Sequence, residues 1–217
     1  VYSRSGNGNI APIRTISGSG TGLKYPGGIA VDTVNDEIFV TNGNNSITVY
    51  SRAANGDIPP LRTISGGSTG ISQAEGIVVD TVNDEIVVAN YYLNNSITIY
   101  SRTANGNISP LRTISGVATG LDFPTSIALD TENNEIIVAN YGNDSITIYS
   151  RDANGDFAPI RIISGSAPGC APRLRMYHGI ALDTVNEEIF AVNVWDDSIT
   201  IYSRTANGNV APLRVIS

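Results

Sequence analysis

The residue types with the widest chemical range gather in one stretch of the chain, residues 165–179. This stretch holds the only histidine of the sequence, His178, together with Tyr177 and two arginines, Arg173 and Arg175. Guanidinium groups beside aromatic rings bind anions, sugar-like ligands or acidic protein segments through charge-assisted hydrogen bonds and stacking. We therefore expect part of a ligand-binding surface here. The alternative is a loop that only packs over the rim of the fold.

Other candidates stand where repeated segments of the chain differ from one another. One such position is occupied, in successive copies, by Gly27, Glu75, Thr125 and His178. A second is occupied by Gly43, by Tyr91 and Tyr92, by Tyr141, and by Val194 and Trp195. Diversity on a constant frame is typical of a binding surface on a rigid scaffold. The ligand-binding candidates are therefore Arg173, Arg175, Tyr177, His178, Trp195, Glu75, Tyr91 and Tyr141.

The sequence offers no complete catalytic constellation. It shows no recognisable Ser-His-Asp set, glycine-rich phosphate loop or paired-carboxylate motif. Glu75 and His178 remain as one conceivable acid–base pair, a general base and its partner. His178 alone makes no metal site, because no second histidine and no cysteine pair accompany it. We therefore favour a protein that is not an enzyme.

A recurring acidic turn, Asp-Thr-x-Asn-x-Glu, carries many of the carboxylates, and its first copy contains Asp32, Asp36 and Glu37. Hard oxygen ligands of this kind suit Ca²⁺. Ten of the twelve arginines also recur with the repeat, which favours a different interpretation, a set of Arg–carboxylate pairs and Asx turns. We therefore expect no cofactor, with Ca²⁺ as the alternative.

Two further features concern modification. Cys170 is the only cysteine, so an internal disulfide is excluded, and this thiol is either inert or an intermolecular link. Four Asn-x-Ser sequences are candidates for glycosylation in a secreted protein. They begin at Asn44, Asn94, Asn107 and Asn143.

Composition narrows the set of partners. The net charge of −7 and the pI of about 4.6 disfavour contact with a phosphate backbone, so we expect no nucleic acid partner. No apolar run approaches the ~20 residues of a membrane helix, so we expect no membrane insertion. Lys24 is the only lysine among many Asn, Ser, Thr and Gly residues, which favours a secreted, extracellular or cell-surface protein. The chain opens at Val1 within a repeat, without Met or a signal peptide, which favours a processed or truncated product.

The elements that position these residues follow from an internal repeat. The string Tyr-Ser-Arg, then Asn-Gly, then Pro-x-Arg recurs, and its second arginine returns after 48, 50, 49 and 53 residues. These arginines are Arg14, Arg62, Arg112, Arg161 and Arg214. A second string, Ile-(Ala/Val)-(Val/Leu)-Asp-Thr, occurs between them and ends at Thr33, Thr81, Thr131 and Thr184.

One unit contains four short segments rich in β-branched residues, and each predicts a strand. In the first complete unit they cover residues 29–32, 37–41, 46–52 and 61–65. Asn-Gly between the third and fourth segments, as at Asn55 and Gly56, is the strongest short hairpin signal. A proline opens the fourth segment of each copy, so that segment should form an edge strand.

A single four-stranded sheet cannot bury both of its faces. Stacking successive sheets around an axis buries them, and this predicts an all-β fold, a β-propeller of four-stranded antiparallel blades. A parallel β-helix is the structural alternative. It would have shorter rungs and no Asn-Gly hairpins, so we favour the propeller.

Three strings of the first complete unit resemble the NHL-type β-propeller repeat and its YVTN, lactonase-like relatives. They are Gly-Ile-Ala-Val-Asp (28–32), Glu-Ile-Phe-Val-Thr-Asn (37–42) and Ser-Ile-Thr-Val-Tyr (46–50). The resemblance covers the whole chain and implies that the first strand of each unit is innermost and the fourth outermost. Relatives similar to gluconolactonases hold a divalent metal in the central channel with Glu, Asn and Asp. The matching channel positions here are Glu75, Thr125 and His178, with Asn90, Asn140 and Asn193 as further candidates. The asparagine recurs in every copy of the repeat, which suggests a structural turn as its alternative role.

The motif count predicts four complete blades plus the outer half of a fifth, in a single domain over residues 1–217. The half-blade covers residues 1–17, and the blades cover about 28–65, 76–115, 126–164 and 179–217. A closed ring would need at least one more inner hairpin. Flanking sequence or self-association into a homo-oligomer would supply it.

The sequence leaves two candidate functions. The favoured one is a non-catalytic extracellular propeller, a binding or self-assembling scaffold whose variable loops on one side take a protein or glycan ligand. The alternative is a metal-dependent, lactonase-like hydrolase with a site in the central channel.

Overall fold

The computed structural model describes residues 1–93, 95–164 and 179–217. Several candidate residues lie outside the described residues, namely Asn94, Cys170, Arg173, Arg175, Tyr177 and His178. The described chain is built of short β-strands, with two 3₁₀ turns at Ser19–Thr21 and Val117–Thr119. No helix within these ranges has the length and apolar character needed to cross a membrane.

The strands form four sheets whose main strands pair antiparallel in chain order. The first sheet consists of β1 (Pro26–Asp32), β2 (Glu37–Asn42), β3 (Ser46–Ser51) and β4 (Arg62–Ser65). The second consists of β5 (Ala74–Asp80), β6 (Glu85–Asn90), β7 (Ser96–Ser101) and β8 (Arg112–Ile114). The third consists of β9 (Pro124–Asp130), β10 (Glu135–Asn140), β11 (Ser145–Ser150) and β12 (Arg161–Ser164). The fourth consists of β13 (Ile180–Asp183), β14 (Glu188–Asn193), β15 (Ser198–Ser203) and β17 (Arg214–Ile216). The short β16 (Gly208–Asn209) pairs in parallel with β12.

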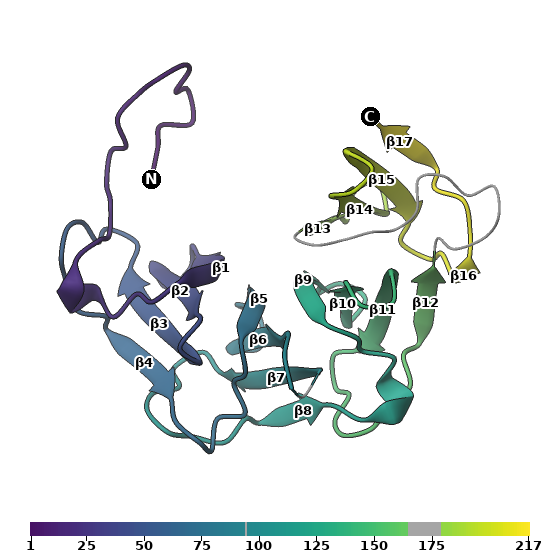
Figure 1. The fold of residues 1–217 in the computed structure, drawn as a ribbon, viewed down its shortest axis with the longest axis horizontal. Helices are drawn as coiled ribbons and strands as arrows, with labels where there is room; N and C mark the ends of the chain where they lie inside the picture. Colours follow the sequence, from purple (N-terminus) through teal and green to yellow (C-terminus); the bar gives the residue numbers. More distant parts are fainter. Residues whose placement is uncertain (94, 165–178) are drawn as a thin grey trace.

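The four sheets stand as blades around one axis, in an open arc (Figure 1). The strands β1, β5, β9 and β13 lie innermost, and the fourth strand of each blade lies outermost. The N-terminal segment and the fourth blade lie on the two sides of the opening (Figure 1). The predicted fold class is therefore confirmed: the chain is an all-β propeller with four-stranded blades.

The apolar core lies between blades. One cluster joins Phe39 and Val49 of the first blade to Ile86 and Tyr100 of the second, and all four side chains are buried. Because alternate side chains of a strand point to opposite faces of its sheet, an inner blade packs against two neighbours. Full burial of such a side chain contributes about 1.5–3 kcal/mol. The repeated apolar strings therefore specify an array of sheets.

The Asn-Gly pairs lie in the predicted connections between the third and fourth strands and have a second role as well. The third and fourth strands do pair, but residues 52–61 join β3 to β4, so Asn55 and Gly56 form no two-residue hairpin turn. Gly56, at a φ of 83°, bridges to Ile16, and its N–H donates to the Thr15 carbonyl at 2.7 Å. The Asn55 Oδ1 accepts the Thr15 N–H at 3.0 Å. The predicted antiparallel pairing of the third and fourth strands is therefore confirmed, and the Asn-Gly pair of their connection also joins one blade position to the next.

The same contact between blades covers part of the free edge of the outer strands. They lie outermost as predicted, but the following blade covers their outer edge at one point. The bridges that do so are Ile64–Gly106, Ile114–Gly155 and Ile163–Gly208. The edge predicted from the prolines is therefore capped in the first three blades.

The half-blade predicted over residues 1–17 contains no regular strand. Its Ile13 N–H donates to the Val1 carbonyl at 2.8 Å, the same contact that the Leu61 N–H makes to the Val49 carbonyl at 2.7 Å. This segment therefore follows the path of an outer hairpin without extended strand pairing.

Candidate functional site

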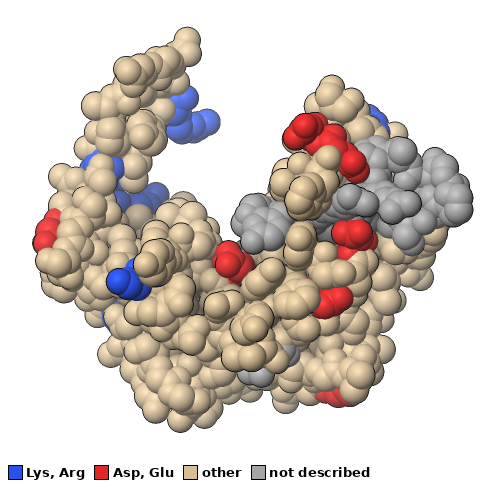
Figure 2. Space-filling model, in the orientation of Figure 1, with Lys and Arg blue, Asp and Glu red and all other residues tan. Residues whose placement is uncertain are grey.

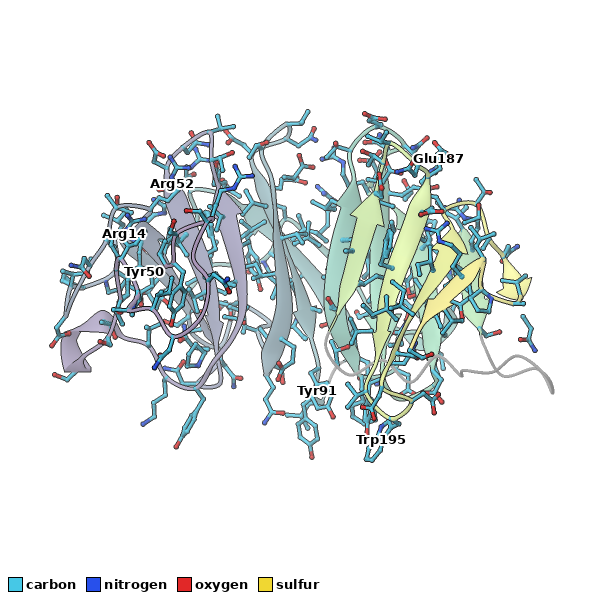
Figure 3. The ribbon with its side chains drawn as sticks, turned by 90° about the horizontal axis from the view of Figure 1, so that it is seen from above. Arg14, Tyr50, Arg52, Tyr91, Glu187 and Trp195 are labelled. Carbon is cyan, nitrogen blue, oxygen red and sulfur yellow. The ribbon has the colours of Figure 1, made fainter. Side chains whose placement is uncertain are left out.

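Figure 3 shows two faces of the propeller edge-on, with Arg52 and Glu187 on one and Tyr91 and Trp195 on the other. We call the first the latch face. It carries the first-to-second-strand turns, residues 33–36, 81–84, 131–134 and 184–187. We call the second the loop face. It carries the second-to-third-strand turns, residues 43–45, 91–95, 141–144 and 194–197, and the segments 22–25, 70–73 and 120–123 that lead into inner strands.

On the latch face, an arginine of the outer strand binds a glutamate of the second strand. Arg62 donates from Nη1 and Nη2 to the two carboxylate oxygens of Glu37, at 2.6 and 2.9 Å. This forked, charge-assisted pair fixes both side chains in one geometry. The equivalent pairs are Arg112–Glu85, Arg161–Glu135 and Arg214–Glu188.

A second arginine joins each blade to the one before it. Arg102 of the second blade donates to Glu37 Oε2 of the first at 2.9 Å and lies 3.8 Å from Asp32 Oδ2. We call this contact between blades a latch. The equivalent latches are Arg151–Asp80 and Arg204–Asp130. The predicted Arg–carboxylate pairs are therefore present, and they join blades as well as strands.

Asp32 is fully buried at the end of β1. Its Oδ1 accepts the N–H groups of Val34 and Asn35 at 2.9 and 2.8 Å, which makes the predicted Asx turn. Burial by itself raises the pKa of this carboxyl, but these hydrogen bonds and the charge of Arg102 outweigh it and the pKa lies below its ordinary value. N–H and guanidinium donors thus occupy the positions around Asp32 that a calcium ion would need. Across the described ranges, no group of three or more His, Cys, Asp or Glu side chains is placed to hold a metal.

A hollow of about 380 Å³ lies between the inner strands. Gly27 of β1, Glu75 of β5 and Thr125 of β9 line it, so three residues predicted at one position do meet there. Within the described part of its wall, Glu75 is the one titratable side chain, among glycine, hydroxyl and aliphatic groups. This wall does not fit the Glu, Asn and Asp ligand set of a gluconolactonase-like metal site.

The asparagine that ends each second strand holds the loop face together. Asn90 is fully buried, accepts the Ser72 N–H at 3.0 Å and donates to Thr98 Oγ1 at 3.0 Å. Asn140 makes the same two kinds of contact. Asn193 is also buried and donates to Thr200. The amides of Asn90, Asn140 and Asn193 therefore fix neighbouring strands and loops, which agrees with the structural role suggested by their recurrence in the repeat.

Asparagines of the loop face also tie the first blade to the second and the second blade to the third. Asn45 Oδ1 accepts the Gln73 N–H at 2.8 Å, and Asn95 Oδ1 accepts the Phe123 N–H at 2.9 Å. Both asparagines adopt a positive φ, which this residue tolerates. Because these bonds reach main-chain groups, they hold Gln73 and Phe123 in place whatever their side chains are.

Aromatic side chains stand on these loops. Tyr91 packs on Phe123, with ring centroids 5.2 Å apart and planes tilted by 43°. Tyr25 is 79% exposed, Tyr92 47% and Trp195 64%. We call this set the aromatic rim, and it consists of Tyr25, Tyr91, Tyr92, Phe123 and Trp195.

The loops of the rim carry mainly acidic charge. This face points toward the viewer in Figure 2, where most of the surface is uncharged and acidic groups are scattered among the blades. The acidic side chains of the loop-face segments are Asp122, Asp144, Asp196 and Asp197. The basic one within the described segments is Lys24, whose Nζ lies 5.3 Å from the ring centroid of Tyr25.

The structure places Tyr91 and Trp195 on the predicted face, and the half-buried Tyr141 lies on the same face, with its N–H bonded to the Phe123 carbonyl at 3.1 Å. Sequence reasoning missed Tyr25 and Phe123. Both directly precede the proline that opens an inner strand, and both adopt a left-handed φ, at 47° and 48°. Bulky residues seldom hold that conformation, and such strain clusters at functional sites.

Three of the four candidate glycosylation sites lie within the described chain. Asn44 and Asn143 are exposed in loop-face turns, and Asn107 is exposed in the connection between β7 and β8, where its Oδ1 accepts the Ser68 N–H at 2.8 Å. Glycosylation of these residues stays a prediction.

A comparison with protein-family models matches residues 107–215 to a family described as lactonase, seven-bladed β-propeller. A search of curated proteins returned no match.

Two solved structures resemble the chain at 16% identity each, which shows the fold alone. One is described as a nidogen/laminin complex, with a TM-score of 0.63 over 84% of this chain and 60% of that one. The other is hydrazine synthase of Kuenenia stuttgartiensis, with a TM-score of 0.64 over 96% of this chain and 52% of that one. The chain therefore spans between half and two thirds of the length of these structures.

Proposed function

The chain belongs to the lactonase family of seven-bladed β-propellers. We propose that this member of the family is a non-catalytic, extracellular binding module. Its loop face takes a protein segment that carries arginine or lysine. The observation that carries the proposal is the exposed aromatic rim among acidic groups, on a frame that the latch face holds together.

The chemistry of the rim selects the ligand. Trp195 is exposed and is followed directly by Asp196 and Asp197. An arginine or lysine side chain stacks on the face of tryptophan or tyrosine and pairs with a neighbouring carboxylate. Tryptophan and tyrosine are also the residues that most often dominate protein interfaces. A basic segment therefore suits the described part of this face.

The hydrogen bonds of the frame preorganise the loops of the loop face for binding. Loops already held by Asn45, Asn90 and Asn95 lose little conformational freedom on binding, and this lowers the entropic cost of association. Constant frame contacts under varied side chains are the arrangement of a scaffold that carries recognition on loops.

The nidogen/laminin structure is, by its title, a complex of proteins. This supports a protein ligand over a glycan for the present chain. Extracellular location and self-association are parts of the same proposal, which secretion of the full-length protein and light scattering would test.

Selection from a phage-displayed library of random peptides tests the proposal. We expect peptides enriched in arginine or lysine, and we expect Trp195→Ala to weaken the best of them by about tenfold or more in fluorescence anisotropy. The matched control is Val185→Ala, which removes an exposed apolar side chain from the latch face. Failure to select any peptide, or equal losses in both variants, would contradict the proposal.

Lactone hydrolysis is the second candidate, favoured by the family and by Glu75 in the wall of the hollow. Glu75 would act as a general base: it takes a proton from water, and the hydroxide adds to the lactone carbonyl. The ring ester bond then breaks, and the leaving alkoxide takes the proton back from Glu75 to give a hydroxy acid. A panel of sugar lactones, assayed with and without divalent metal, tests this. Turnover that is lost in Glu75→Gln would favour the enzyme over the binding module.

A further inference from the structure

One side of the first blade is exposed where the other blades are covered. Ile29 of β1 is 65% exposed, whereas its equivalents Ile77 and Ile127 in β5 and β9 are 6% and 5% exposed. Val31 is 51% exposed, whereas its equivalents Val79 and Leu129 are half-buried. A mostly apolar groove of about 470 Å³ runs along this side. We call it the first-blade groove, and it is lined by Tyr2, Arg14, Ile29, Ile38, Val40 and Tyr50.

The interfaces inside the molecule show what covers such a side. At the second blade, Ala30 and Phe39 from the inner hairpin of the first blade pack against Ile86 and Tyr100. The equivalent side of the first blade meets no inner hairpin within the described chain. An inner hairpin is therefore the element whose shape suits the groove.

Two arginines beside the groove are arranged as in a complete interface. In a complete one, Arg62 and Arg102 converge on Glu37, and Arg62 Nη2 also donates to the Arg102 carbonyl at 3.2 Å. Arg14 and Arg52 hold the equivalent positions, and Arg14 Nη2 donates to the Arg52 carbonyl at the same 3.2 Å.

The difference lies in the carboxylates of a preceding blade, which Arg102 meets in Asp32 and Glu37, whereas Arg102 and Arg52 both pair with an aspartate of their own blade. Arg52 pairs with Asp36 of its own blade, on a surface where the two side chains are 46% and 67% exposed. Within the described residues, Arg14 forms no ion pair. The guanidinium groups of Arg14 and Arg52 are thus arranged like those that bind a glutamate and an aspartate of the preceding blade elsewhere. The groove therefore carries the positive half of a latch without the carboxylates of a preceding blade.

The outer part of this blade position is already filled. Ile16 bridges to Gly56 as Ile64 bridges to Gly106 in the next blade. A whole second copy, whose fourth blade carries its own outer strand β17, would collide with residues 15–17. An inner hairpin alone has room, because it would pair on the inner side of these residues.

We propose that the first-blade groove binds a β-hairpin from outside residues 1–217, of the inner-strand type found in these repeats. Its two strands cover the apolar side of the first blade. Its turn presents an aspartate and a glutamate in the Asp-Thr-x-Asn-x-Glu spacing of Asp32 and Glu37. The glutamate receives Arg14 and Arg52, and the aspartate lies beside Arg52.

A synthetic peptide with the sequence of residues 26–48 is the first probe, titrated against the full chain by fluorescence anisotropy. We expect saturable binding that weakens about tenfold or more when the peptide carries Asp32→Asn and Glu37→Gln, or when the chain carries Arg14→Gln or Arg52→Gln. The matched control is Arg4→Gln, an exposed arginine of the same segment, which should leave the affinity unchanged.

The second probe is the same segment joined covalently to the chain, because a free peptide that is too unstructured would not bind. Because Val1 corresponds to Val49, a copy of residues 26–48 joined ahead of Val1 continues into the chain in register. We expect a higher melting temperature, and a clearly smaller gain when the added copy carries the same two neutral substitutions. If the extension adds no stability, or if neutral and acidic copies act alike, the proposal is overturned. A dimer of the unextended chain that Arg52→Gln dissolves would likewise overturn it, in favour of a second copy.

Discussion

The latch face and the loop face both join neighbouring blades, but they do so through different polar groups. On the latch face, Arg102, Arg151 and Arg204 bind carboxylates of the preceding blade, and these side chains repeat from blade to blade. On the loop face, conserved contacts go to main-chain groups, and the side chains above them differ between blades. Because the loop-face contacts do not depend on side-chain identity at their main-chain partners, that face has freedom to vary, and our proposal assigns recognition to it.

The largest expected effect is the loss of a central latch. Arg151→Ala leaves Asp80 buried without its guanidinium partner, and breaking such a pair costs about 3–5 kcal/mol. Urea unfolding measures this loss. Arg52→Ala is the matched control, because its pair is exposed and worth about 0–1 kcal/mol. Equal losses in the two variants would remove the distinction between buried latches and surface pairs.

Acid should weaken the latch face as a whole. The hydrogen bond from Arg62 holds the pKa of Glu37 below its ordinary 4.5, and at Asp80 the donors Asn83 and Arg151 outweigh the effect of burial and hold the pKa below 3.8. A carboxyl with a lowered folded pKa stabilises fully above its unfolded value, and that contribution is lost as pH falls through the folded pKa. We expect urea midpoints that are flat above about pH 5 and fall below about pH 4. A Glu37→Gln variant should show a shallower fall, and an unchanged slope would contradict this account.

A smaller loss of stability is expected when a buried tyrosine hydroxyl is removed. The buried hydroxyl of Tyr149 donates to the Thr119 carbonyl at 2.6 Å, and burial raises the pKa of this tyrosine. Tyr149→Phe leaves that carbonyl without its donor, at a cost of about 1–3 kcal/mol in unfolding free energy. Tyr25→Phe, at an exposed ring, is the control and should change stability little.

The smallest effect on stability is expected on the loop face. Trp195→Ala removes a side chain that is 64% exposed, so the unfolding free energy should change by less than about 0.5 kcal/mol. Thermal unfolding beside Val185→Ala checks this. A large loss would mean that Trp195 supports the frame, and the two faces would not divide stability from recognition.

Much of the fold follows from sequence because the same strand and turn strings recur in every blade. The alternating Ile-Thr-Ile pattern fixed the third strands, and β7 runs over Ser96–Ser101 as the pattern predicts to within a residue. Asn55 and Gly56 indicated the hairpin between β3 and β4 but not their contact with the neighbouring blade position, because a local turn signal is the same with or without that contact. That contact depends on the position of Thr15, which lies far away in the sequence.

The candidate site was predicted in part for the same reason. Trp195 and Tyr91 stood out because they break the repeat. Tyr25 and Phe123 did not, because their left-handed φ is invisible in sequence, and the reach of Asn95 to Phe123 is a contact between blades. Glu75 was placed in the channel correctly because its position relative to the inner strand fixes the direction of its side chain.

Chemical-shift mapping of the bound basic peptide tests the division between the faces most directly. With the selected peptide added to labelled protein, the account predicts that the amide shifts change in the loop-face turns, residues 91–93, 141–144 and 194–197, and leave the latch-face turns, residues 33–36, 81–84 and 131–134, unchanged. Changes centred on the latch-face turns, or confined to the wall of the hollow around Glu75, would contradict it.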